Sequence, residues 1–264
     1  MNTNISKIKT SDEIEYEKLL FDLLQLEEIL VNKELELSTL NSTLTFFEAR
    51  YIKIVGEKFS ELDDLVAQLL QILANRNPKN KKYQQSAKEA QQRAHESSQA
   101  SGRAAKKEDI PDNFEPSNDI KKLYHDIAKR IHPDLSTNEE ERSFREELMK
   151  EVNEAYSSGD ILRLQVLLSS IVNSEDYRAQ NGIRKQIEVI KMKISKINAR
   201  ITTIDYEINH LIVSDLYQLK LQVDEAENHG MDLLGKMASQ VVSRIKRIEQ
   251  QLYGIIKEQN EWGE

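Results

Sequence analysis

The sequence predicts an all-α protein in which elongated coiled-coil arms flank a small helical hairpin. Three observations support this class: the 264 residues include only 8 Gly and 4 Pro, 31% of the residues are charged, and apolar residues recur at helical spacing over long stretches. A sheet-rich fold of this length would need a turn about every ten to fifteen residues, and Gly and Pro supply most turns. Charge-rich chains with such periodicity are typical of coiled coils.

Residues 12–75 are expected to form the first arm, a coiled coil that follows an N-terminal tail, residues 1–11. Steps of four and three from Leu19 to Tyr51 meet an apolar residue at nine of ten positions. Around Gly56 two steps of four follow each other, and such a stutter unwinds a supercoil locally without ending the helix. Because Pro78 cannot continue a helix, we expect the arm to end just before it.

Residues 76–117 are interpreted as a basic linker. Between Arg76 and Lys107 there are nine Lys or Arg and two Glu, a local charge of +7 in a chain whose formal charge is −8. Residues 84–100 have helix-forming composition, but they show no stripe of large apolar residues by which packing could hold a helix. Between Arg76 and Lys107 there is one aromatic residue, Tyr83, and no stacking array, so we do not expect nucleic-acid binding.

Residues 183–260 are expected to form a C-terminal helical hairpin or coiled coil. From Ile183 to Leu211 all nine heptad positions are apolar, and the pattern then shifts by one residue to Ile212. No Gly or Pro lies between Gly182 and Gly230, so we expect one helix of about 45 residues there. The Asn-His-Gly sequence that ends at Gly230 is a helix stop, and a further helix with an apolar stripe follows it.

Helices of this length need partner helices, because so long an apolar seam cannot be buried against one small domain. Three arrangements fit the sequence: the two arms pair with each other, the C-terminal helices fold into a hairpin, or either arm dimerises. We therefore expect intramolecular arm pairing or a homodimer.

Residues 118–172 are predicted to form a small domain that begins with a basic amphipathic helix. Apolar residues between Ile120 and Ile131 recur at helical spacing and make one apolar face. Pro133 cannot lie inside this helix and marks its end. Four basic residues lie elsewhere on the surface of the helix: Lys121, Lys122, Lys129 and Arg130.

A second amphipathic helix is expected from the acidic run that starts at Glu139, since negative charge suits the first turn of a helix. The two helices are expected to pack antiparallel, with His132-Pro133-Asp134 in the connecting loop. The residues expected to face the first helix are Phe144, Leu148, Val152, Ala155 and Tyr156.

Residues 120–134 resemble helix II and the His-Pro-Asp signature of the J domain, the co-chaperone module typified by DnaJ. Residues 149–156 are similar to the end of helix III of that module. Three features coincide: the tripeptide, the Lys-Lys-x-Tyr helix before it, and the Val-Asn-Glu-Ala-Tyr run at the expected distance. The resemblance covers roughly fifty of the 264 residues and does not include the arms.

The chain departs from the family pattern before Ile120. The usual first helix, with its Tyr-x-x-Leu-Gly-Val start, is missing, since the preceding residues are few and proline-rich. Support for the basic helix must therefore come from Phe114, from the linker helix or from one of the arms. The zinc-binding and Gly/Phe-rich regions of full-length DnaJ do not appear either, and zero cysteine excludes the zinc module.

The resemblance implies that the loop docks on the ATP state of a DnaK-type chaperone and stimulates its ATP hydrolysis by favouring one conformation. Asp134 would offer a carboxylate to an arginine of the partner, Pro133 would restrict the backbone, and His132 would supply a ring for packing or hydrogen bonding. The positive charges of the four basic residues would attract an acidic surface of the partner and so speed association. The arms would hold an unknown client or adaptor.

The competing interpretation is a coiled-coil structural or assembly scaffold whose J-like hairpin makes no chaperone contact. We expect neither an enzyme nor a cofactor, because the sequence has no glycine-rich phosphate loop, metal-binding cluster or nucleophile arrangement. Zero cysteine fits a reducing compartment. Since no secretory signal and no membrane span are visible, we expect a cytoplasmic protein.

Overall fold

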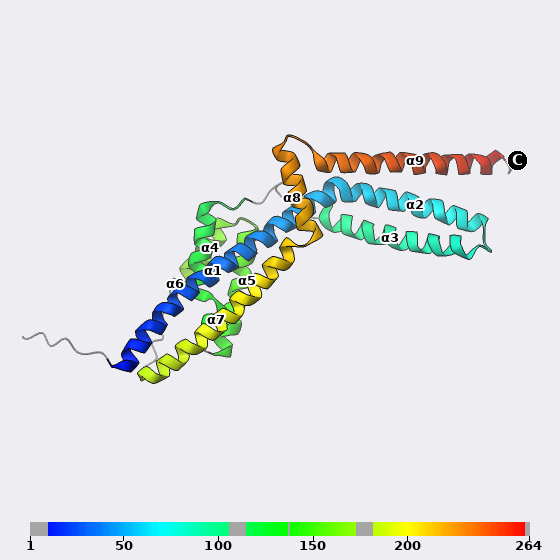
Figure 1. The fold of residues 1–264 in the computed structure, drawn as a ribbon. Helices are drawn as coiled ribbons and strands as arrows, with labels where there is room; N and C mark the ends of the chain where they lie inside the picture. Colours follow the sequence, from blue (N-terminus) through cyan, green and yellow to red (C-terminus); the bar gives the residue numbers. More distant parts are fainter. Residues whose placement is uncertain (1–9, 106–114, 137, 173–181, 262–264) are drawn as a thin grey trace, which may run out of the picture. The chain divides into compact units, whose positions relative to one another are not determined.

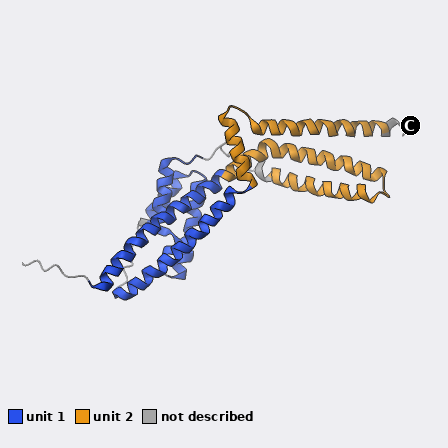
Figure 2. Cartoon of the chain, viewed as in Figure 1, with its two compact units in different colours: residues 1–43, 115–214 blue, residues 44–114, 215–264 orange. Residues whose placement is uncertain are grey.

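The computed structural model describes residues 10–105, 115–136, 138–172 and 182–261. All regular structure in these ranges is helical and no strand occurs among them, which confirms the expectation of an all-α protein. The chain divides into two compact units, residues 1–43 with 115–214 and residues 44–114 with 215–264 (Figures 1 and 2). The elements in chain order are α1 Ser11–Tyr51, η1 Ile52–Gly56, α2 Glu57–Arg76, α3 Lys81–Ala105, α4 Asn118–Ile131, η2 Pro133–Leu135, α5 Glu139–Ser157, α6 Ile161–Val172, α7 Ile183–Ile212, α8 Asp215–Asn228 and α9 Leu233–Glu261.

In the first unit, α1 and α7 lie side by side and run parallel (Figure 1). Ion pairs of 3.0 Å join Asp12 to Arg184 near the starts of the two helices and Lys33 to Asp205 further along both. The two arms therefore pair with each other inside one chain, one of the three arrangements that fit the sequence. Each fully buried Leu or Ile in this seam contributes about 1.5 to 3 kcal/mol of transfer free energy. The buried seam residues are Leu23, Leu30, Leu37, Ile190, Ile197, Ile204 and Ile208.

Helices α4, α5 and α6 pack on one another in the same unit, and α4 and α5 also contact α1. Helix α4 begins after Ser117, whose Oγ accepts a hydrogen bond from the Ile120 N–H at 3.3 Å. Helix α5 begins after Asn138, whose Oδ1 accepts from the Glu141 N–H at 2.7 Å. Both caps satisfy a backbone donor that the start of a helix leaves unpaired, which explains where the two helices begin.

The apolar faces of α4 and α5 are buried largely as the sequence predicts, with one exception. Phe144 is 65% exposed, so its predicted place in the α4–α5 contact is wrong. The side chain that meets the end of α4 is instead that of Arg145, which donates to the carbonyl oxygens of Arg130 and His132. The buried residues of the two helices are Ile120, Tyr124, Ile127, Ala128, Ile131, Met149, Val152, Ala155 and Tyr156.

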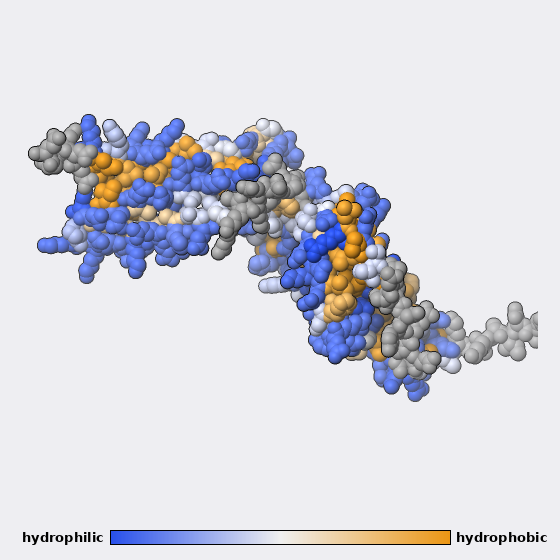
Figure 3. Space-filling model, turned by 180° about the vertical axis from the view of Figure 1, so that it is seen from behind, coloured by the Kyte–Doolittle hydropathy of each residue, from blue (hydrophilic) through white to orange (hydrophobic). Residues whose placement is uncertain are grey.

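Helix α6 folds back after α5 at Gly159, which has a φ of 69°. A residue of left-handed conformation commonly ends a helix, and glycine adopts it without a steric cost. The inner face of α6 is buried through Leu164, Leu167 and Ile171. On its outer face Leu162 is exposed, and Figure 3 shows that apolar side chains reach the surface of both units.

In the second unit, α2 packs against both α3 and α9. The helical backbone continues from α1 through η1, a single π-helical stretch, into α2, and it ends at Arg76 before Pro78. The stutter near Gly56 thus coincides with a local change of helical pitch and does not end the helix, as expected.

Residues 81–105, expected as part of a linker, form helix α3 packed along α2. The packed face consists of small side chains rather than large apolar ones: Ala87 and Ala90 are buried, and Ala94 is half-buried one turn later. Gln84 also donates from Nε2 to the carbonyl oxygen of Ala74 on α2 at 2.8 Å. Because alanines bury little area each but allow helices to approach closely, a search for large apolar residues does not detect this face.

The single helix expected between Gly182 and Gly230 is two helices, so that expectation is wrong. Helix α7 ends at Ile212, and α8 begins at Asp215. The break follows the one-residue shift of the apolar pattern. There the Leu211 carbonyl accepts from both the Ser214 N–H at 3.1 Å and the Ser214 Oγ at 2.6 Å.

The predicted helix stop before Gly230 is confirmed. Helix α8 ends at Asn228, and Gly230 has a φ of 71°. Helix α9 then packs against α2, where Leu62 forms a buried cluster with Val241 and Ile245. The second unit therefore buries the seams of α2 and α9 against each other.

Candidate functional site

The turn between α4 and α5, residues 132–135, contains the His132-Pro133-Asp134 signature and is called the α4–α5 turn below. Helix α4 ends at Ile131, because Pro133 has no N–H with which to continue it. The Leu135 N–H donates to the His132 carbonyl, and the Ser136 N–H donates to the Pro133 carbonyl, both at 3.0 Å. These two bonds close a single 3-10 turn and give its three signature residues one defined backbone conformation.

Arg145 of α5 fixes the α4–α5 turn from the side of the hairpin. Its Nη1 lies 3.3 Å from the carbonyl oxygens of both Arg130 and His132, and its Nη2 donates to Glu141 at 2.6 Å. A cation at this position satisfies carbonyls that the end of a helix leaves unpaired and opposes the negative end of the helix dipole. Leu135 packs against the α1–α7 seam, so the turn is held on two sides.

The His132 ring is buried, with an exposed fraction of 2%. Its Nδ1 accepts a hydrogen bond from the Asp134 N–H at 3.2 Å, and this nitrogen therefore carries no proton. The proton of the neutral ring is then on Nε2, which lies 3.1 Å from Oε1 of Glu34 on α1. The structure thus directs His132 toward α1 and not toward the surface of the turn.

Glu34 is a buried carboxylate held by two donors. Besides His132, it accepts from Arg200 of α7, with Nε to Oε1 at 2.8 Å and Nη2 to Oε2 at 3.1 Å. Burial by itself raises the pKa of Glu34, but the hydrogen bonds from His132 and Arg200 and the charge of Arg200 hold the pKa below its ordinary value of 4.5. Glu34 is therefore ionised at neutral pH.

Glu34 and Arg200 are not among the residues that the sequence predicts for this site. Glu34 is 98 residues from His132 and 166 residues from Arg200. Neither residue belongs to a local motif, and no pattern within one sequence connects three polar side chains over such separations. The pairing of α1 with α7 and of α4 with α1 brings them together.

Asp134 and Pro133 are half-buried in the α4–α5 turn. The backbone N–H of Asp134 is bonded to His132, but the Asp134 carboxylate forms no hydrogen bond or ion pair with any other residue that the structure describes. A carboxylate on an ordered turn without a partner is able to accept a cation from another molecule.

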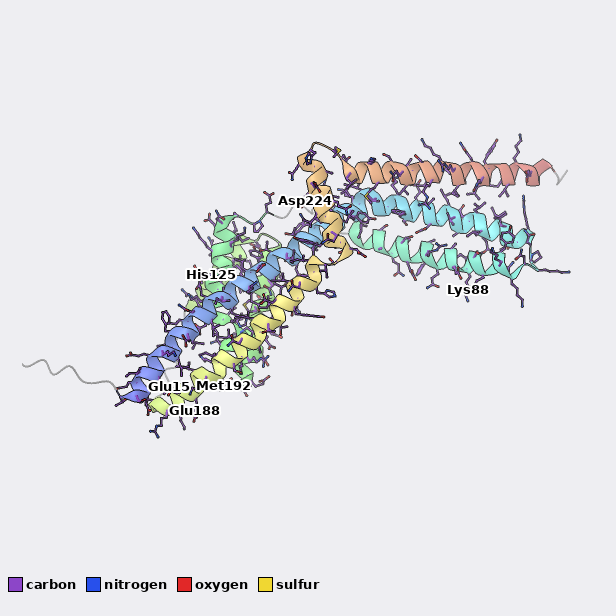
Figure 4. All side chains as sticks on the ribbon, viewed as in Figure 1. Glu15, Lys88, His125, Glu188, Met192 and Asp224 are labelled. Carbon is purple, nitrogen blue, oxygen red and sulfur yellow. The ribbon has the colours of Figure 1, made fainter. Side chains whose placement is uncertain are left out.

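Lys129, one of the four predicted basic residues, is engaged inside the chain. Its Nζ lies 2.7 Å from Oε2 of Glu28 on α1, and Nε2 of His125 lies 2.9 Å from Oε1 of the same carboxylate (His125 is labelled in Figure 4). The hydrogen bond from Lys129 is the main cause that lowers the pKa of Glu28. The face of α4 that includes Lys129 is therefore turned toward α1.

The other three predicted basic residues of α4 differ from Lys129 in their contacts. Lys122 and Arg130 are exposed, and Lys121 is half-buried. None of the three forms an ion pair with another residue in the described part of the chain. Their charges are therefore not compensated by a direct carboxylate contact there.

Tyr124 and Tyr156 form the centre of the α4–α5 contact and are core residues. Both are fully buried, and their ring centroids are 4.8 Å apart. The Tyr124 hydroxyl donates to Oδ1 of Asn153 at 2.8 Å, and burial raises the pKa of Tyr124 well above its ordinary range. The Tyr156 hydroxyl lies 2.7 Å from Oγ1 of Thr39 on α1. These rings therefore hold the hairpin together and tie it to α1.

From the sequence, support for the basic helix α4 is expected from an arm, the linker helix or Phe114. In the structure, α1 of the first arm packs against the α4–α5 hairpin. It contacts the hairpin through Glu28, Glu34 and Thr39. Phe114 lies outside the described residues.

In the second unit, α3 is rich in Lys and Arg, but the described residues of this unit form no evident chemical site. Across the described ranges, no group of three or more His, Cys, Asp or Glu side chains could hold a metal ion. A shallow groove beside α3 is lined mostly by Gln and Lys, including Lys81 and Lys88 (Lys88 is labelled in Figure 4). Tyr83, the single Phe, Tyr or Trp of α3, is half-buried. The groove has no aromatic platform on which bases could stack.

The comparisons with known proteins gave no match with a family model, a curated protein or a solved structure. Among the helices that the structure describes, none is both long and apolar enough to cross a membrane. The functional assignment therefore depends on the α4–α5 turn and its surroundings.

Proposed function

We propose that this protein is a J-domain-like co-chaperone that docks on the ATP state of a DnaK-type chaperone through the α4–α5 turn and stimulates its ATP hydrolysis. The observation that carries the proposal is the Asp134 carboxylate, which lies in an ordered turn and has no partner among the described residues. Such a carboxylate can accept a charge-assisted, bidentate contact from an arginine of another protein.

The rigidity of the α4–α5 turn supports this role. Pro133 restricts the backbone, Arg145 binds the carbonyl on each side of the helix end, and Leu135 anchors the turn in the α1–α7 seam. A contact made by an already ordered segment loses less conformational entropy on binding than one made by a mobile loop.

The exposed basic residues of α4 support association with an acidic partner surface. Lys122 and Arg130 are solvated and uncompensated by a described carboxylate, so they would act mainly through long-range attraction. Lys129, which is bonded to Glu28, would contribute less. This division predicts that the basic residues change the association rate and its salt dependence more than the dissociation rate.

The long helices would hold a client or adaptor. Because the α1–α7 seam is filled within one chain, the arrangement favours intramolecular pairing over a homodimer built on this seam. Exposed apolar side chains remain near the start of α1, at Ile14, Phe21 and Leu24, and apolar surface of this kind suits a protein partner.

The proposed activity requires no bond-breaking step and no cofactor from this chain. Binding energy would raise ATP hydrolysis by the partner only if this protein binds one conformation of the partner more tightly than the other. We place the pair in the cytoplasm.

A single-turnover ATPase assay with the cognate DnaK-type chaperone tests the proposal. The wild-type protein should raise the hydrolysis rate, and Asp134→Asn should weaken the stimulation at least about tenfold, since a charge pair at the contact would lose one partner. Asp126→Asn, an exposed carboxylate on α4, is the matched control and should behave as wild type. Absence of stimulation by wild type, or equal stimulation by Asp134→Asn, would contradict the proposal.

The second candidate function is an assembly scaffold, and the burial of His132 together with the Lys129–Glu28 contact favours it. In both cases a residue that a J domain would present to a chaperone contacts α1 of the same chain instead. In that case Asp134→Ala should leave activity in the cell intact, whereas polar substitutions at Ile194 and Ile201, which pack on the α1–α7 seam, should abolish it.

A further inference from the structure

A continuous line of polar contacts connects α7 to the backbone of Asp134 within the first unit. Nη1 of Arg200 donates to Glu207 at 3.2 Å, and Nε and Nη2 of Arg200 bind both oxygens of Glu34. Glu34 also accepts a hydrogen bond from Nε2–H of His132, and Nδ1 of His132 accepts one from the Asp134 N–H. The line ends on the residue whose carboxylate is proposed to contact the chaperone.

Every link in this line has a fixed direction. Arg200 has only donors, and ionised Glu34 has only acceptors, so the His132 nitrogen that faces Glu34 must carry the proton. The neutral ring has a single N–H, so its other nitrogen offers a lone pair to the Asp134 N–H. The charge of Glu34 therefore selects the ring tautomer that holds the turn.

Burial of His132 and Glu34 strengthens the preference for this tautomer of the ring. His132 is almost completely buried, and Glu34 is buried as well, so water does not readily replace either partner. Arg200 compensates the carboxylate with two parallel bonds, without which the charge would be costly in the interior. If Glu34 and Arg200 were both replaced by neutral residues, only the weak bond from the Asp134 N–H would still favour the Nε2–H tautomer.

We infer that Glu34 and Arg200 are positioning residues for docking, which act through His132 to fix the Asp134 backbone. This inference rests on the proposed function and deepens it, because it makes α1 and α7 part of the docking site. His132 then serves the contact from inside the protein, and the partner meets Asp134.

The test compares full-length variants by NMR and by binding. Glu34→Gln/Arg200→Gln removes both buried charges together, so that neither is left alone. Glu28→Gln is the control, because it weakens another α1–α4 contact without touching His132. The readouts are the ¹⁵N shifts of the His132 ring, the hydrogen exchange of the Asp134 amide, and the affinity for the ATP state of the chaperone.

In wild type and in Glu28→Gln we expect the proton on Nε2 of His132 and a protected Asp134 amide. In the double variant both tautomers should appear, the Asp134 amide should exchange about tenfold faster, and the chaperone should bind about fivefold to tenfold more weakly, the loss of one modest hydrogen bond. Thermal unfolding monitored by circular dichroism shows whether each variant is folded.

A rescue variant separates positioning from general stability. The amide oxygen of an Asn side chain is always an acceptor, unlike an imidazole nitrogen, which accepts only when it carries no proton. With Asn at position 132, this oxygen could accept from the N–H two residues later, as helix-cap residues do. His132→Asn added to the double variant should therefore restore protection of the Asp134 amide and recover most of the affinity.

Three results would overturn the inference: a wild-type ring with its proton on Nδ1, a double variant with unchanged Asp134 exchange and affinity, or equal losses in Glu28→Gln. If the NMR results are as expected but wild type does not bind the chaperone, the proposed function is wrong, and the line of contacts remains as a feature of the fold alone.

Discussion

Oε1 of Glu34 lies 3.1 Å from Nε2 of His132, although the two residues are 98 positions apart in the chain. Their contact joins the first long helix to the turn that carries the His-Pro-Asp signature. Arg200 adds α7 to the same contact. The α4–α5 hairpin is therefore joined to the paired long helices, and the His132 ring is one of the points of contact.

Loss of Glu34 should destabilise the protein. Glu34→Ala would leave the Arg200 guanidinium with Glu207 alone and the His132 Nε2–H without its acceptor. We expect the free energy of unfolding to fall by about 2 to 4 kcal/mol, because partners of a broken buried pair keep their desolvation cost. Urea unfolding measures this change. Glu36→Ala, at an exposed ion pair on the same helix, should cost under about 1 kcal/mol; equal losses would show that Glu34 is not specially coupled.

The Glu34 contact should also make stability depend on acid pH. Since the pKa of Glu34 is lower in the folded protein than its ordinary value of 4.5, its ionised form contributes stability above that pH. This contribution is lost as the pH falls through the folded pKa. We expect the free energy of unfolding to drop more steeply below about pH 5 in wild type than in Glu34→Gln. Denaturant unfolding at a series of pH values gives both curves, and parallel curves would refute the expectation.

The α1–α7 seam should carry a large part of the stability of the first unit. Ile197 is fully buried in it, so Ile197→Ala should cost about 3 kcal/mol through lost transfer free energy and a cavity. Met192→Ala, at an exposed position of the same helix, should cost under about 1 kcal/mol. Because the seam closes within one chain, the unfolding midpoint should not change over a tenfold range of protein concentration. A midpoint that rises with concentration would indicate pairing between chains.

The alanine face of α3 should be sensitive to larger side chains. Ala90 is 1% exposed, and Ala90→Leu would force α3 away from α2 or into strained rotamers. We expect a loss of about 1 to 3 kcal/mol in the free energy of unfolding. Gln92→Leu, on the exposed side of the same helix, should change it by no more than about 0.5 kcal/mol. Tolerance of Leu at both positions would mean that the face is not closely packed.

Much of the helical architecture follows from local patterns in the sequence. The Leu and Ile repeats of the two arms, the end of α4 before Pro133, the helix stop at Gly230 and the change of pitch near Gly56 all appear where the patterns indicate them. These features depend on the geometry of a single helix or turn, so residues a few positions apart are enough to specify them.

Which face of a helix is buried could not be predicted from the local sequence of that helix alone. Phe144 has helical spacing suited to the α4–α5 contact but is exposed, because Arg145 and not Phe144 meets the end of α4. Helix α3 has no large apolar stripe, yet it packs through alanines because α2 lies close enough to contact them. In both cases the partner helix decides which face is buried.

The sequence alone was sufficient to indicate an all-helical protein and a turn with the signature residues, because apolar periodicity and proline act over short distances. The choice of α7 as the parallel partner of α1, and the meeting of Glu34, Arg200 and His132, depend on contacts between distant segments. A repeat of apolar residues specifies that a helix needs a partner but not which one, since many seams bury similar area. Only the packed chain selects among them, and with that selection it directs His132 inward, while the Asp134 carboxylate has no partner among the described residues.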